Sequence, residues 1–282
     1  MKLSPRLLKR VFLPLLALVA LLISFAFWWQ ARIESRVDLS RKLIGRWATE
    51  GQADSLAAGQ PMVLTGGVAR VKGRKGTALS FDGTDGHVSV PDAPEMAMRT
   101  GQDFSVTAWI QPMHADTSFG IMSIVDKRKV GGILTARGFC LNLSDGRLAC
   151  QIAPPVGFHM TKASLFAPST WVPLWKGRNA LTQVASFIFV SPGPDLRDGQ
   201  FHHVALTLDR HSKKGGKLYV DGRLVMTFDA TKSNGNLANS EPLLIGTHPD
   251  TTLHAGFKGL IEDVRLYSRA LSQAEIETAA DQ

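Results

Sequence analysis

The sequence predicts an all-β fold, a two-sheet antiparallel β-sandwich of the jelly-roll type, preceded by a single N-terminal transmembrane α-helix. Apolar and polar residues alternate in many short segments, and a period of two is typical of half-buried strands. Asp-Gly pairs stand between such segments and favour tight hairpins. No helical pattern of about 10–15 residues separates the segments, which argues against parallel βαβ units.

The N-terminal segment predicts a membrane anchor. After a basic tail over residues 1–10, the stretch 11–29 from Val11 to Trp29 carries no charged residue. As a helix it would reach roughly 28 Å, close to the ~30 Å hydrocarbon core of a bilayer. Trp28 and Trp29 end it, where indole rings favour the headgroup layer. A cleaved signal peptide is the alternative, but the apolar run is longer than such peptides usually have.

The excess of basic residues belongs to this N-terminal region. Residues 1–46 hold 9 of the 32 Lys and Arg and 2 of the 24 Asp and Glu, so the remaining 236 residues hold 23 and 22. A nucleic-acid-binding domain would carry the excess on its folded body, so we expect no nucleic-acid partner. We expect the N-terminus on the cytoplasmic side, a short and helical juxtamembrane stalk over residues 30–42, and one folded domain over residues 43–282.

Strands are expected throughout the domain, with a single helix at its end. The stretch 198–230 supplies three consecutive antiparallel strands and contains the Asp221-Gly222 turn. Ser272 and Glu275 form a capping box at the start of the C-terminal helix. The expected strands cover residues 61–65, 67–70, 78–81, 87–91, 104–111, 120–126, 139–143, 148–152, 186–191, 204–208, 218–220, 224–228, 243–245 and 259–267.

Six segments occur together in one order, GTALSFDG, HVSVP, FSVTAWI, DGQFHHVA, LYVDG and GLIEDVRLYSRAL. In this order they resemble the laminin-G-like domains of the concanavalin A-like lectin/glucanase superfamily, over roughly residues 43–280. Phe201 stands where the family usually has Trp. The resemblance implies two stacked antiparallel sheets and an extracytoplasmic module that binds glycans or proteins, sometimes with Ca²⁺. Together with the anchor, it places the chain in a bacterial inner membrane with the domain in the periplasm.

The chemistry-bearing residues favour a non-enzymatic protein. His202 and His203 are adjacent on a strand, so their side chains leave opposite faces and cannot share one metal or act as one base. Glu262 and Asp263 are likewise adjacent, whereas retaining glycosidases need two carboxyl groups ~5 Å apart on the same side. Serine-hydrolase, zinc-protease and phosphate-loop motifs are all missing from the sequence. No catalytic residue or cofactor is therefore expected.

Calcium remains a weak candidate ligand. Asp82, Asp85 and Asp126 lie in or near predicted turns, where carboxylate oxygens can gather around a hard cation. The alternative is that Asp82 and Asp85 only supply turn chemistry.

The two cysteines are expected to be free thiols. A two-residue turn at Asp145-Gly146 pairs Leu143 with Leu148, Leu141 with Cys150 and Phe139 with Ile152. Cys140 then lies on the opposite face of the sheet from Cys150. A slip of one residue would turn the apolar side chains to the wrong face.

Residues 154–183 form a long insertion rich in aromatic residues and proline. A loop of this length in a compact domain is usually functional or disordered, and the aromatic content argues against disorder. We interpret it either as a partner-binding surface or as a flap over one sheet. The candidate partner-binding residues are Phe158, His159, Trp171 and Trp175.

The expected function is an accessory or structural subunit, a recognition or assembly module that docks on another inner-membrane protein. A short stalk, a full-length anchor and the lack of catalytic motifs favour it. The alternative is a lectin-like module that binds periplasmic or cell-wall glycan, which the resemblance favours.

Overall fold

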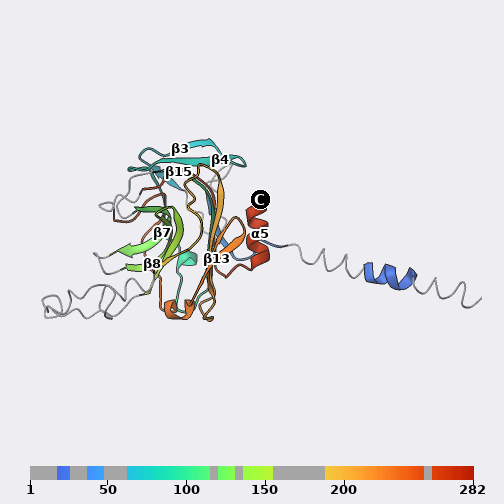
Figure 1. Cartoon of the computed structure of the whole chain (residues 1–282). Coiled ribbons are helices and arrows are strands. Elements are labelled where there is room, and N and C mark those ends of the chain that lie inside the picture. Colours follow the sequence, from blue (N-terminus) through green and yellow to red (C-terminus); the bar gives the residue numbers. More distant parts are fainter. Residues whose placement is uncertain are drawn as a thin grey trace, which may run out of the picture. The chain divides into compact units, whose positions relative to one another are not determined.

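The computed structural model divides the chain into two compact units, Met1–Asp38 and Leu39–Gln282. In the first unit, residues 18–25 are helical and exposed. Over the residues described, no helix is both long and apolar enough to cross a bilayer. Most of the predicted span, including Val11, Trp28 and Trp29, lies outside these residues. The structure describes residues 18–25, 37–47, 62–114, 120–130, 136–154, 188–250 and 256–282 (Figure 1).

The second unit is a sandwich of two antiparallel sheets, which confirms the predicted fold class. Within the described residues, the eight strands of sheet A run β13 (Arg223–Phe228), β12 (Gly216–Val220), β11 (His202–Leu208), β6 (Phe104–Pro112), β15 (Lys258–Tyr267), β4 (Thr77–Asp82) and β3 (Ala69–Lys72), with β1 (Leu43–Trp47) also on β15. The seven strands of sheet B run β10 (Ile188–Val190), β9 (Arg147–Ala153), β8 (Ala136–Ser144), β7 (Ile121–Val130), β14 (Leu243–Ile245), β5 (His87–Val90) and β2 (Val63–Thr65). In the described part of the chain, the 3₁₀ helices η2 (Pro94–Met96) and η5 (Ala230–Ser233) connect strands.

The main core lies between the sheets, and a smaller one lies on the outer face of sheet A. On β11 the inward residues Val204, Leu206 and Leu208 are fully buried, as the alternation predicts. The outward Ala205 is buried as well, because helix α5 (Gln273–Asp281) covers this face (Figure 1). The second core contains Ala205, Tyr219, Tyr267, Leu271 and Ile276.

Two tight turns set the register of their hairpins. Asp221 and Gly222 have φ values of 49° and 74°, and Asp145 and Gly146 have 48° and 77°. Positive φ at both central residues defines the type I′ turn that hairpins prefer. The pairing of β8 with β9 is the predicted one, with Leu143 opposite Leu148 and Leu141 opposite Cys150. Both cysteines are free and buried, which confirms the prediction.

The prediction of a helical stalk over residues 30–42 is wrong for residues 39–42. Residues 39–42 form a turn in which Leu43 donates its N–H to the Ser40 carbonyl at 3.2 Å, and Lys42 has a φ of 55°. The strand β1 follows at once and pairs with β15. Burial of Ile44 and Trp47 in the main core accounts for this, since tertiary packing overrides helix propensity.

The two adjacent histidines lie in different environments. His203 is buried against Trp109, with ring centroids 5.3 Å apart, and burial lowers its pKa to about 4. His202 lies between two carboxylates, with Nδ1 2.9 Å from Asp221 and Nε2 3.0 Å from Asp198. The hydrogen bond with Asp221 raises the pKa of His202. Both histidines therefore have structural roles, as expected.

The His202 contacts predict a pH-dependent stability. A folded-state pKa above the ordinary value of 6.5 means that this contribution is complete below pH 6.5 and is lost as the pH rises through the folded pKa. The melting temperature of the His202→Gln variant should therefore differ most from the wild type below pH 6.5, and the difference should shrink in alkaline buffer. Asp221→Asn keeps the turn, because Asn-Gly suits type I′. Its melting temperature should also approach that of the wild type as the pH rises. A constant difference across this range would contradict the assignment.

The C-terminal helix has the predicted capping box. Ser272 Oγ accepts the N–H of Glu275 at 3.4 Å, and the Ser272 N–H donates to Glu275 Oε2 at 2.8 Å. The helix contributes Ile276 to the second core and also buries Ala279.

Loss of this cap should destabilise the domain. Ser272→Ala is expected to lower the free energy of unfolding by about 1 kcal/mol, measured by chemical denaturation. Ser272→Asp retains a capping oxygen and should stay near the wild-type value. Equal stability of the Ser272→Ala variant and the wild type would show that α5 is held by packing alone.

Candidate functional site

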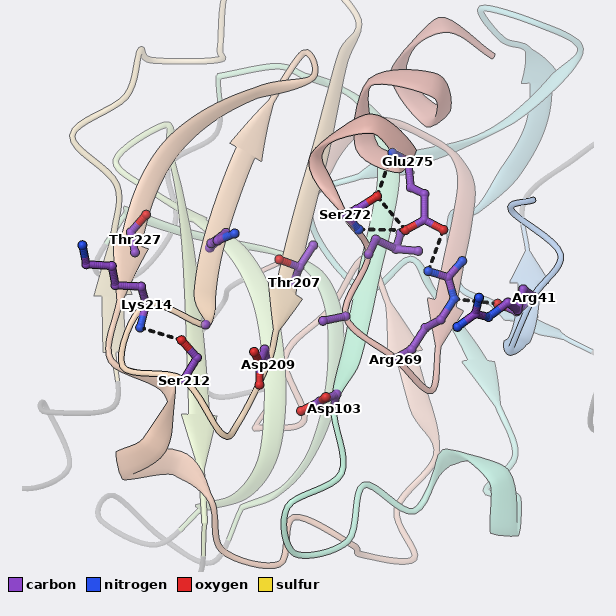
Figure 2. Close-up of a pocket in the computed structure, with 14 residues that line it drawn as sticks. Arg41, Asp103, Thr207, Asp209, Ser212, Lys214, Thr227, Arg269, Ser272 and Glu275 are labelled. Carbon is purple, nitrogen blue, oxygen red and sulfur yellow. Dashed lines mark hydrogen bonds and ion pairs between the residues drawn. The ribbon is translucent and has the colours of Figure 1, made fainter. Parts of the chain in front are cut away.

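A polar groove of about 670 Å³ lies on the outer face of sheet A beside the start of α5 (Figure 2). Its floor is a row of three side chains from neighbouring strands. Thr207 on β11 pairs with Lys217 on β12, which pairs with Thr227 on β13. Strands lie ~4.8 Å apart, so the row presents a hydroxyl, an ammonium and a second hydroxyl at regular spacing. We call this site the α5 groove.

One wall of the α5 groove is the segment 269–272. Ser105 holds it to the sheet, because its hydroxyl donates to the Arg269 carbonyl and accepts the N–H of Leu271, both at 2.9 Å. Arg269 pairs with Glu275 at 2.7 Å and donates from Nε to the Arg41 carbonyl at 2.9 Å. These bonds fix Arg41 at the edge of the groove (Figure 2).

The other end of the groove is formed by two carboxylates that shape the loops. Asp103 accepts the N–H of Arg210 at 2.7 Å, and Asp209 accepts the N–H of His211 at 3.0 Å. The side chain of Arg210 is fully buried and donates to several loop carbonyls, including that of Arg99 at 2.8 Å. Its burial lowers its pKa to about 10. The loops around the groove are thus tied to one buried guanidinium.

Three cationic side chains in the groove are available for a ligand. Within the described chain, the side chains of Arg41, Lys214 and Lys217 make no hydrogen bond or ion pair. The lining residues include no aromatic ring, so a sugar could not stack here. The arrangement can instead bind hydroxyl and anionic groups through charge-assisted hydrogen bonds.

The predicted partner-binding residues Phe158, His159, Trp171 and Trp175 lie outside the described residues. The chain leaves the described part after Pro154 and re-enters it at Ile188. Since β9 and β10 pair with each other, both points belong to the same edge of sheet B.

The three calcium candidates do not form one ligand set. Asp82 accepts hydrogen bonds from the N–H and hydroxyl of Thr84, at 2.9 and 2.6 Å, and these bonds lower its pKa. The Thr84 hydroxyl also lies 3.3 Å from Asp85 Oδ1, to which it can donate, so both carboxylates shape a turn. Asp126 lies elsewhere, buried in an ion pair with Arg128. In the described ranges, no group of three or more His, Cys, Asp or Glu could hold a metal ion.

The adjacent acidic pair on β15 is engaged in structural bonds. Glu262 accepts the N–H groups of Arg74 and Lys75, at 2.7 and 3.0 Å. Asp263 has a φ of 53° at a register shift and accepts from Arg265 Nε at 3.0 Å. Glu262 therefore stabilises the turn at residues 73–76, and Asp263 is held in ion pairs with Arg46 and Arg265.

Sequence reasoning did not find the α5 groove. Thr207 and Thr227 lie within predicted strands, whereas Lys217 precedes the predicted strand 218–220 by one residue. The Asp-Gly turn fixes which residues of β12 and β13 oppose each other. The wall depends on where α5 folds back onto the sheet, for which the sequence carries no local signal.

Comparisons with known proteins identify the family of this chain. The family model described as the concanavalin A-like lectin/glucanases superfamily matches residues 82–277. No curated protein matches the sequence.

Several solved structures share the fold. The binding domain of paraclostridial mosquitocidal protein 1 aligns with a TM-score of 0.61 at 15% identity, over 85% of this chain and 52% of that chain. The binding domain of botulinum neurotoxin DC in complex with SialylT aligns with 0.58 at 11%, over 86% and 52%. Domain 4 of AbnA, a GH43 extracellular arabinanase from Geobacillus stearothermophilus, in complex with arabinotriose, aligns with 0.51 at 16%, over 85% and 98%.

This chain spans about half the length of the two toxin binding domains. At such identities the likeness shows the fold alone, whereas the family match covers more than half of the sequence. The chain therefore belongs to the concanavalin A-like lectin/glucanases superfamily.

Proposed function

We propose that this protein is a non-catalytic recognition module that binds a glycan in the α5 groove. The observation that carries the proposal is the groove floor, in which Thr207, Lys217 and Thr227 form a row across three strands. Hydroxyl and ammonium groups at strand spacing suit a ligand with many hydroxyl groups. The groove walls are held by hydrogen bonds between side chains and backbone groups, so little ordering is required when a ligand binds.

Two of the similar structures contain ligands that support a binding role. Their descriptions name arabinotriose with the arabinanase domain and SialylT with the neurotoxin domain. In this chain, Glu262, Asp263, His202 and His203 are all committed to structural contacts. Those contacts favour recognition over hydrolysis.

We further propose that the apolar stretch 11–29 anchors the module in a bacterial inner membrane. Its length and the terminal tryptophans support a single span, with the N-terminus cytoplasmic and the sandwich in the periplasm.

A second candidate function is docking on another membrane protein as an accessory subunit. The edge strands β10 and β13 meet where Phe189 stacks on Phe228, with ring centroids 3.8 Å apart. Nearby on these strands, Ile188, Val190 and Leu224 are 47%, 43% and 48% exposed. Exposed apolar side chains on neighbouring edges favour a protein partner. Native-gel sizing of the detergent-extracted protein should then show a stoichiometric complex instead of a single 30.6 kDa chain.

Glycan binding is tested by filling the groove. Thr227 is exposed on an edge strand, so Thr227→Trp should fold and place an indole over the floor. Binding of the full chain to a glycan array should be lost in this variant. Thr65→Trp, at another exposed strand position on sheet B, is the matched control and should bind like the wild type. Wild-type binding by the Thr227→Trp variant would refute the proposed site.

A further inference from the structure

The charge distribution within the α5 groove identifies the class of ligand, an inference that rests on the proposed function. Seven lining side chains are charged, namely Arg41, Lys214, Lys217, Arg269, Asp103, Asp209 and Glu275. Arg269 and Glu275 neutralise each other as an ion pair. Of the remaining five, the three cations are the groups without a partner in the described chain.

The carboxylates and the cations occupy different parts of the groove. Asp103 and Asp209 lie at one end, each holding a backbone N–H with one oxygen, while Lys214 and Arg41 lie on either side (Figure 2). Lys217 stands on the floor between the two threonines. A ligand that satisfies this groove must offer hydroxyl donors to the carboxylates and anionic oxygens to the cations.

We infer that the α5 groove binds an acidic oligosaccharide, whose sugar rings carry carboxylate groups beside their hydroxyl groups. A neutral glycan would leave the ammonium groups of Lys214 and Lys217 without counter-charge when the groove is desolvated, which is costly. A phospholipid headgroup would satisfy these cations but offers few hydroxyl donors to Asp103 and Asp209. The observed combination of groups matches a polyhydroxylated acid best.

The groove is also built to hold such a ligand in place. The wall 269–272 is held by Ser105, and the loops at the other end by the buried Arg210. Charge-assisted hydrogen bonds are shorter and stronger than neutral ones, and a preorganised frame lowers the ordering cost of forming them. Lys213, the neighbour of Lys214, is exposed but does not line the groove, so it supplies a natural control.

The experiment compares two ligands of identical ring structure. Oligogalacturonate and its methyl ester are titrated into the full chain in detergent at low and high salt, because binding through carboxylates should weaken with salt. The acid should bind and the ester should bind at least about tenfold more weakly, as expected for loss of charge-assisted bonds. The double variant Lys214→Gln/Lys217→Gln should lose the preference for the acid, while Lys213→Gln should keep it.

The outcomes separate this inference from the proposed function. Equal, salt-insensitive binding of acid and ester that is still blocked by Thr227→Trp would overturn the ligand class and leave the glycan site standing. Displacement of oligogalacturonate by short-chain phosphatidylglycerol would overturn it in favour of a lipid headgroup. Lack of binding by either sugar would overturn this inference, and sugar binding that Thr227→Trp does not affect would overturn the site itself.

Discussion

The architecture of the site depends on burial of the outer face of sheet A beneath α5. Leu271 and Ile276 pack on Ala205, Tyr219 and Tyr267, and these residues form a core separate from the one between the sheets. A free sheet face in a sandwich is normally polar and exposed. Here part of the face is apolar and covered, and the groove exists because the cover stops at the segment 269–272. Apolar burial therefore determines where the polar surface begins.

Two buried polar groups convert this packing into a defined groove. Ser105 forms two hydrogen bonds that hold the wall, and Arg210 binds the loops at the other end. An isolated buried arginine would be strongly destabilising, so its several carbonyl partners are needed to offset desolvation. The carboxylates of Asp103 and Asp209 are held separately, by the backbone N–H groups of Arg210 and His211, without using the lysines.

Local patterns predicted most of the fold. Alternation identified the strands, the Asp-Gly pairs gave the turns, and burial of one face of β8 and β9 fixed the register that separates the two cysteines. The predictions were poorest where contacts between residues distant in sequence determine the local structure. Residues 39–42 carry good helix formers, yet a turn forms there and the strand β1 follows. The reason is that β4 pairs only with the N-terminal part of β15, which leaves an edge over residues 264–267 for β1. The groove was missed for the same reason, since its wall comes from a helix folded back over strands distant in sequence.

The free cysteines have a practical consequence. Burial raises the pKa of Cys140 to about 11 and that of Cys150 well above its ordinary value, so thiolate is scarce in the native state. A cysteine introduced on the surface would react alone with maleimide dyes, which makes the molecule suitable for site-specific fluorescence.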